Sequence, residues 1–156
     1  MKTASLLALG ALSLGALAPA ANAQTAFGVG GGFDTDADAA FLTVQARTPR
    51  GASFPVRVNP QFDLYFPGDN ITQLQGNLNL LYDFSVNNTT FTPYAGAGLG
   101  VGYYKPDNAD TDINLGANFI FGAEFGMGRA RPYAQLQIST TRNTGAGVAG
   151  GIMFGF

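Results

Sequence analysis

The feature that most constrains this fold is an alternation of large apolar residues with small or polar ones, repeated along the chain. In residues 148–156 the even positions carry Val148, Ile152, Phe154 and Phe156, and small or flexible residues occupy the odd positions. Successive side chains of a β-strand point to opposite faces, so a period of two indicates a strand. The segment therefore predicts a strand with one strongly apolar face, which needs a firm anchor at the end of a chain.

The N-terminal 23 residues have a different pattern. Lys2 precedes an apolar run over residues 6–17, and Ala21-Asn22-Ala23 fits a small-x-small cleavage site. The alternative is a transmembrane anchor, but the run is shorter than the roughly 18 to 20 apolar residues that a spanning helix needs. We therefore predict a signal peptide over residues 1–23 and one mature domain over residues 24–156, beginning at Gln24.

Composition narrows the class of that domain. The sequence has no Cys, 22 Gly and 13 Phe, and only 12% of its residues are charged. An exported domain of this size without disulfides must gain its stability elsewhere, and a bilayer around a closed barrel would supply it. The net charge of -2 becomes -3 without Lys2, which predicts no nucleic-acid partner.

The alternation recurs in seven earlier segments, most clearly in residues 56–66. There, the even positions hold Val56, Val58, Phe62, Leu64 and Phe66, and the odd positions hold Arg57, Asn59, Gln61, Asp63 and Tyr65. The other segments cover residues 27–33, 40–47, 73–84, 94–103, 112–125 and 133–139. The alternation is less clean in residues 40–47, and Ile120 is the one misfit of residues 112–125. Eight such segments predict an all-β fold, an eight-stranded antiparallel up-and-down transmembrane β-barrel with apolar rows facing lipid.

The predicted connections carry opposite charges at the two ends of this barrel. With both termini in the periplasm, residues 34–39, 67–70, 105–111 and 140–144 face outward, and residues 47–53, 85–92 and 126–131 face the periplasm. The outer set and adjoining strand ends contain two cations, Lys105 and Arg142, against seven aspartates: Asp34, Asp36, Asp38, Asp69, Asp107, Asp110 and Asp112. The periplasmic rim contains Arg47, Arg50, Arg129 and Arg131 against a single acid, Asp83. Chance clustering in polar loops is the alternative explanation.

Three charged residues fall well within the rows predicted to face the lumen. They are Arg57, Asp63 and Glu124, and because buried charges must be paired, we predict that Arg57 pairs with Glu124 or Asp63. The surrounding polar network is predicted to include Gln73, Gln75, Asn77, Tyr94, Gln135 and Gln137. Since eight strands leave no aqueous channel, a structural network is favoured over ion conduction.

The residue types argue against catalysis. Outer-membrane barrels that are enzymes, such as lipid A deacylases, phospholipases and omptin-type proteases, resemble one another in using histidine for proton transfer, and this chain has no His. No serine lies near Glu124 or Asp63 in the pattern to act as a nucleophile. We therefore predict no catalytic residues and no enzymatic activity.

Two further motifs invite ligand-binding interpretations. The glycine-rich residues 28–32 and 96–102 precede no helical period, so they predict bare strand faces that make room for side chains in the lumen, not a phosphate loop. Asp34, Asp36 and Asp38 resemble the start of a calcium loop but lack its glycine and distal glutamate. We predict no cofactor and no metal site, with weak divalent-cation binding at these aspartates as a hypothesis.

The predicted signal peptide, the eight amphipathic strands, the alternating turns and Phe156 resemble the small outer-membrane β-barrel family typified by OmpA and OmpX. The resemblance implies the outer membrane of a Gram-negative-type bacterium, contact with the bilayer and lipopolysaccharide, and assembly by the barrel-assembly machinery, for which Phe154 and Phe156 are the predicted signal. It favours a non-enzymatic barrel with a structural or surface-interaction role. The alternatives are a soluble periplasmic lipocalin-like carrier, which would have an apolar interior, and a narrow pore.

Overall fold

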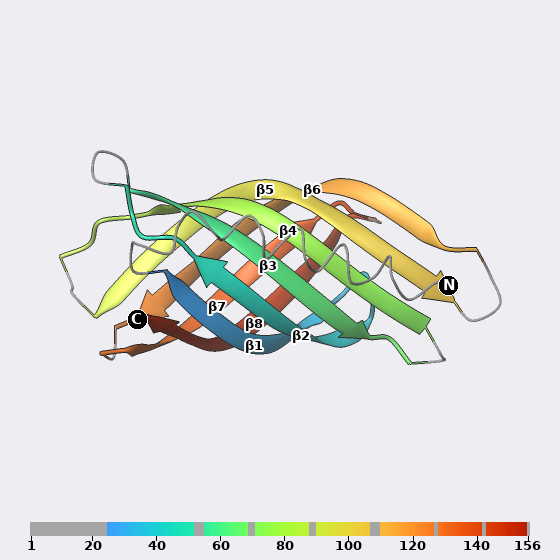
Figure 1. Ribbon diagram of the computed structural model, residues 1–156, viewed down its shortest axis with the longest axis horizontal. Coiled ribbons are helices and arrows are strands. Elements are labelled where there is room, and N and C mark those ends of the chain that lie inside the picture. The colour runs from blue at the N-terminus through green and yellow to red at the C-terminus, as the bar shows by residue number, and fades with distance from the viewer. Residues whose placement is uncertain are drawn as a thin grey trace.

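Eight antiparallel strands close into a barrel in the computed structural model (Figure 1). The structure describes residues 25–51, 55–68, 71–87, 90–106, 110–126, 128–141 and 143–155. The strands are β1 (Ala26–Asp34), β2 (Ala39–Arg47), β3 (Val56–Phe66), β4 (Ile71–Asp83), β5 (Phe91–Pro106), β6 (Asp112–Phe125), β7 (Ala130–Ser139) and β8 (Gly145–Gly155). Each strand pairs with its neighbours in chain order and β8 pairs with β1, which confirms the predicted fold class. Within the described residues, no helix is long and apolar enough to cross a membrane.

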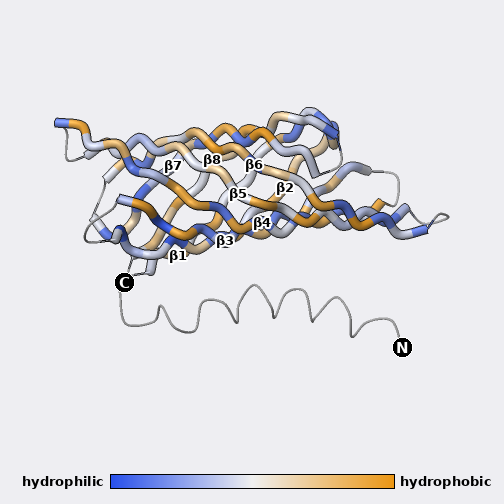
Figure 2. Tube along the Cα trace, turned by 90° about the horizontal axis from the view of Figure 1, so that it is seen from above, coloured by the Kyte–Doolittle hydropathy of each residue, from blue (hydrophilic) through white to orange (hydrophobic). Residues whose placement is uncertain are grey.

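The barrel is polar inside and apolar outside. The side chains of Leu115 and Leu99 are 76% and 66% exposed on the outer surface, whereas Asn59 and Asn79 are fully buried in the lumen. Hydrophobic and hydrophilic residues alternate along the strands in Figure 2. This arrangement suits a bilayer as the surrounding solvent and excludes the lipocalin-like alternative, because that fold would put the apolar rows inside.

The lumen also contains a small apolar cluster. Ile120, which departs from the alternation of its segment, is fully buried and packs with Leu81 and Tyr94. Its side chain lies on the lumen face that the period of two assigns to it. Ile120 therefore departs from the pattern only because it is apolar, since its side chain points to the expected face.

Glycines on the lumen face of β1 and β5 leave space that side chains fill. A Cβ atom at Gly30 would lie 2.3 Å from the hydroxyl of Tyr133, and one at Gly98 would lie 2.4 Å from Oδ1 of Asn79. Both distances are far below ordinary contact. The bare faces thus admit the larger residues of other strands to a lumen that is barely wide enough for them.

The two ends of the barrel differ in charge. Ala26 of β1 pairs with Gly155 of β8, so the start and the finish of the described barrel lie at one end. An even number of antiparallel strands requires this, and we call it the periplasmic end and the opposite one the outer end. Every arginine in the described residues lies in or near the periplasmic half: Arg47, Arg50, Arg57, Arg129 and Arg131.

Candidate functional site

Two places in the barrel bring chemically active side chains together, one at each end. The first is an ion-pair cluster in the periplasmic half of the lumen, centred on Glu124 of β6. Oε1 of Glu124 accepts hydrogen bonds from Nη1 of Arg47 and, at 2.6 Å, from Nη1 of Arg57. Nη2 of Arg57 also donates to Oδ1 of Asp83 at 2.5 Å. Two arginines and two carboxylates from four strands therefore neutralise one another in a site that is almost closed to solvent.

Tyr94 of β5 supports this cluster from the side. Its hydroxyl accepts a hydrogen bond from Nη2 of Arg47 at 2.9 Å, and the Arg47 guanidinium lies 4.5 Å from the centroid of the Tyr94 ring. Nη2 of Arg47 also donates to Oε1 of Gln135 at 3.3 Å. The guanidinium is thus held both by hydrogen bonds and by a cation–π contact, which positions it rigidly.

Of the two partners predicted for Arg57, the structure places Glu124 beside it and not Asp63. Asp63 lies six residues further along β3, roughly 20 Å away by the rise of a strand, so the two side chains cannot meet. Oδ1 and Oδ2 of Asp63 instead accept from Nε2 of Gln61 at 2.9 and 3.0 Å, and Oδ2 accepts from Nδ2 of Asn77 at 3.0 Å. Asp63 is therefore a buried carboxylate held by amides at mid-barrel.

Arg47 and Asp83 are the lumen residues that the sequence prediction missed, because it placed both at the periplasmic rim. They are only 1% exposed. The period of two could have located Arg47, which continues the odd-numbered row of β2. Asp83 likewise ends the odd-numbered row of β4. Arg57 is in register with Leu81, which precedes Asp83 in that row, so Asp83 lies close to Arg57.

The remaining predicted network residues divide between mid-barrel and the outer end. Nε2 of Gln135 donates to Gln61 at 3.3 Å, and Gln137 accepts from Gln61 at 3.2 Å. Nearer the outer end, Nε2 of Gln75 donates to Asn77 at 2.8 Å and to Ser139 at 3.2 Å. Gln73 lies beyond Gln75 and lines the outer end of the lumen.

The second place is a small crevice at the outer end, between the turn after β1 and the residues that follow β7. Its volume is about 20 Å³, and Asp34, Asp36, Ser139 and Thr141 are among the residues that line it. The hydroxyls of Ser139 and Thr141 are 2.9 Å apart. A space of this size with polar walls holds about one water molecule.

The three aspartates of the outer turn do not converge on a metal site. Oδ1 of Asp34 accepts from the backbone N–H groups of Asp36 and Ala37 at 2.9 and 3.0 Å, so this carboxylate closes the turn. Asp38 is exposed and has a φ of 46°. No group of three or more ligating side chains occurs among the residues that the structure describes.

The predicted assembly signal lies at the periplasmic end. Phe154 is 42% exposed on the lipid-facing surface and stands in register with Phe27 of β1 and Ala130 of β7. Phe156 lies outside the described residues.

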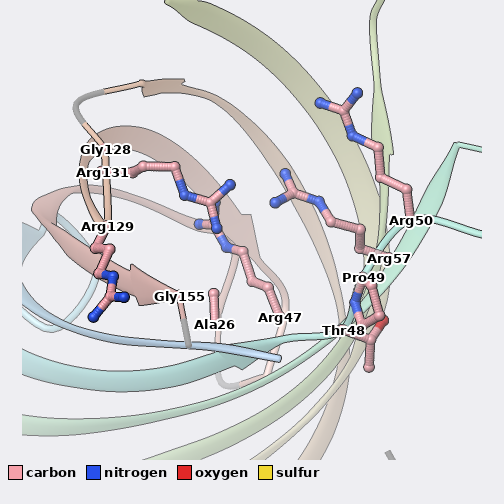
Figure 3. A pocket seen from close by; sticks show the side chains of 10 residues that line it. All are labelled: Ala26, Arg47, Thr48, Pro49, Arg50, Arg57, Gly128, Arg129, Arg131 and Gly155. Carbon is pink, nitrogen blue, oxygen red and sulfur yellow. The ribbon is translucent and has the colours of Figure 1, made fainter. Parts of the chain in front are cut away.

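A cavity of about 810 Å³ opens beneath the ion-pair cluster at the periplasmic end. Five arginines line it: Arg47, Arg50, Arg57, Arg129 and Arg131. In Figure 3, Arg129 and Arg50 flank this space and the other three arginines lie between them. We call it the arginine vestibule.

Several solved outer-membrane barrels share this architecture. The N-terminal barrel domain of Pseudomonas aeruginosa OprF matches with a TM-score of 0.69 and 16% identity, covering 85% of this chain and 97% of that one. Neisserial surface protein A matches with a TM-score of 0.64 and 14% identity over 85% and 95% of the two chains. For Ail of Yersinia pestis, the TM-score is 0.59 and the identity 12%, over 86% and 99%. These identities establish the fold alone.

A sequence profile gives the family. The profile described as lipid A 3-O-deacylase (PagL) matches residues 32–141, which is more than half of the chain. A comparison with curated proteins gives no match. The family and the fold together place the protein in the Gram-negative outer membrane, in contact with the bilayer and its lipopolysaccharide, as predicted.

The profile match overturns the prediction that this barrel is not an enzyme. That prediction of a purely structural or surface-interaction role is wrong, because the matching family is described by an enzymatic activity. The sequence argument considered a carboxylate only as the base for a serine nucleophile near Glu124 or Asp63, and did not consider a carboxylate that activates water directly.

Proposed function

Because the chain belongs to the lipid A 3-O-deacylase (PagL) family, we propose that it hydrolyses an ester bond of lipid A in the outer leaflet of the outer membrane. The match over residues 32–141 is the observation that carries this proposal. The matched region includes part of β1 and all of β2 to β7. It also includes every residue that lines the outer-end crevice except Asn143 and Gly145.

The position of the substrate selects between the two ends of the barrel. Lipid A occupies the outer leaflet, so a group that attacks its ester bonds must lie at the outer end. Glu124 lies at the other end, and its carboxylate is occupied by Arg47, Arg57 and Arg131. The outer-end crevice is therefore the better candidate.

Asp36 is the best candidate for the general base in that crevice. No described residue donates a hydrogen bond to its carboxylate, whereas the carboxylate of Asp34 closes the turn. Asp36 is also held in place, because its side chain packs closely against Gly145. A Cβ atom added at Gly145 would lie only 2.3 Å from the Cβ atom of Asp36. An oriented carboxylate without an internal partner is suited to accept a proton.

Ester hydrolysis then needs a water molecule in the crevice. In the proposed reaction, Asp36 takes a proton from this water as its oxygen attacks the acyl carbonyl carbon. The bond between that carbon and the sugar oxygen breaks, the fatty acid leaves, and the proton passes to the sugar oxygen. The paired hydroxyls of Ser139 and Thr141 line the same crevice and orient the water.

The test is release of a fatty acid from lipid A by the purified barrel in mixed micelles with a nonionic detergent, followed by mass spectrometry. We expect release by the unaltered protein and a loss of about 100-fold or more in Asp36→Asn, since general-base catalysis contributes on that scale. Asp38→Asn is the matched control, because it removes a charge from the same turn and Asn tolerates a positive φ. No release by the unaltered protein would overturn the proposal, and equal release by Asp36→Asn would overturn the role of Asp36.

A further inference from the structure

The arginine vestibule has more positive than negative charges around it. Its five arginines face two carboxylates, Glu124 and Asp83, among the described residues around it, which leaves an excess of three positive charges. Neither carboxylate lines the cavity itself. The walls that a ligand would meet are therefore cationic.

The arginines divide into a buried pair and an accessible rim. Arg47 and Arg57 are at most 5% exposed and are paired with buried carboxylates, so they form the floor. At the rim, the Arg50 side chain is 51% exposed, and Arg131 is 35% exposed with its Nη1 3.4 Å from Glu124. Arg129 is exposed and makes no ion pair with the described residues.

An unsatisfied donor also points to a ligand. Nε of Arg57 is buried and has no hydrogen-bond partner in the described part of the chain, although Arg57 lines the vestibule. A buried N–H group without an acceptor is costly, and a ligand or water in the cavity would satisfy it. The cavity volume of about 810 Å³ is ample for an anion larger than a single phosphate.

We propose that the arginine vestibule binds a phosphate-bearing anion at the periplasmic face of the barrel. Guanidinium groups match the oxygens of phosphate in pairs, and Arg50, Arg129 and Arg131 retain donors for such contacts. The excess of three charges suits a multiply charged phosphate better than a single carboxylate. The phosphate has two possible sources, a soluble phosphate compound of the periplasm or the headgroup of an anionic phospholipid in the inner leaflet.

This site is separate from the proposed hydrolytic crevice, and neither depends on the other. The crevice lies at the opposite end of the lumen and shares no lining residue with the vestibule. A barrel without deacylase activity could therefore still bind phosphate here.

The soluble source is tested by titrating pyrophosphate into the full-length exported protein, purified in a nonionic detergent, with isothermal calorimetry. We expect binding that weakens as NaCl is raised, because the rim arginines are exposed to screening. The double variant Arg50→Gln/Arg129→Gln should weaken it at least 10-fold. Lys105→Gln, which removes an exposed cation at the outer end, should leave it unchanged.

The lipid source is tested by native mass spectrometry of the same proteins taken from nanodiscs that contain phosphatidylglycerol. Retention of this lipid by the unaltered protein and its loss from the double variant would support the headgroup as the ligand. If neither pyrophosphate nor phosphatidylglycerol binds, the proposal is overturned. Equal binding of succinate and pyrophosphate would contradict the assignment to phosphate.

Discussion

Nη1 of Arg57 on β3 lies 2.6 Å from Oε1 of Glu124 on β6, and these two strands are not neighbours in the barrel. The pair therefore crosses the lumen and joins two walls that share no backbone hydrogen bonds. Glu124 also accepts from Arg47 of β2, so one carboxylate links three strands.

Removing the charge of Glu124 should destabilise the barrel strongly. Glu124→Gln leaves the buried guanidinium groups of Arg47 and Arg57 with less compensation, and breaking a buried pair typically costs about 3–5 kcal/mol. The measurement is reversible urea unfolding in lipid vesicles. Asp112→Asn, at an exposed carboxylate of the same strand, should change the free energy of unfolding by less than about 0.5 kcal/mol. Equal effects of the two variants would contradict a stabilising role for the cluster.

The lumen glycines should be intolerant of a methyl group where backbone lies close. A Cβ atom at Gly98 would lie 2.3 Å from the carbonyl oxygen of Leu78, so Gly98→Ala should cost about 1–3 kcal/mol through overpacking. At Gly76 a Cβ atom would meet nothing within 4 Å, and Gly76→Ala is the control. Urea unfolding of both variants checks this, and a neutral Gly98→Ala would show that the lumen can expand.

The cost of a charge on the outer surface should depend on depth in the bilayer. Leu78 is 56% exposed near the middle of β4, and Ile113 is 65% exposed at the outer end of β6. Arginine at the bilayer midplane costs about 2–4 kcal/mol, and near the interface about 0–1 kcal/mol. Leu78→Arg should therefore lower the free energy of unfolding in vesicles much more than Ile113→Arg. A larger loss of stability in Ile113→Arg than in Leu78→Arg would show that the bilayer midplane lies closer to Ile113 than to Leu78.

Assembly should depend on the phenylalanines at the end of the sequence. We propose that Phe154 and Phe156 form a signal for the barrel-assembly machinery. The double variant Phe154→Ala/Phe156→Ala should reduce the heat-modifiable band in the outer-membrane fraction several-fold. Phe27→Ala is the control, since Phe27 pairs with Phe154 across β1 and β8 and is also lipid-facing. An equal loss in the control would indicate lost packing and not a lost signal.

The direction of side chains could be predicted from the sequence because a bilayer outside and a crowded lumen inside impose the same period of two on every strand. Arg57, Asn59 and Gln61 follow it, and even Ile120 lies on the face that its position requires. The pairing of Arg57 with Asp83 of β4 is harder to predict, because it depends on the stagger between β3 and β4. The register that sets Arg57 opposite Leu81 brings Asp83 within reach, and no local pattern encodes that stagger.

The functional prediction failed for a different reason. Both ends of the lumen contain carboxylates, and the sequence pattern does not distinguish the neutralised Glu124 from Asp36, to which no described residue donates a hydrogen bond. That distinction depends on which cations the closed barrel brings near each acid. The crevice around Asp36 also joins residues more than 100 positions apart, such as Asp36 and Ser139.

The proposed hydrolysis of lipid A is tested most directly in cells. Lipid A extracted from a Gram-negative host that produces this barrel should contain a species lacking one ester-linked acyl chain, seen by mass spectrometry as the loss of a hydroxy fatty acid. The host that produces an equal amount of the folded Asp36→Asn variant should lack this species. Identical lipid A from the host with and without the folded, unaltered barrel would contradict the account.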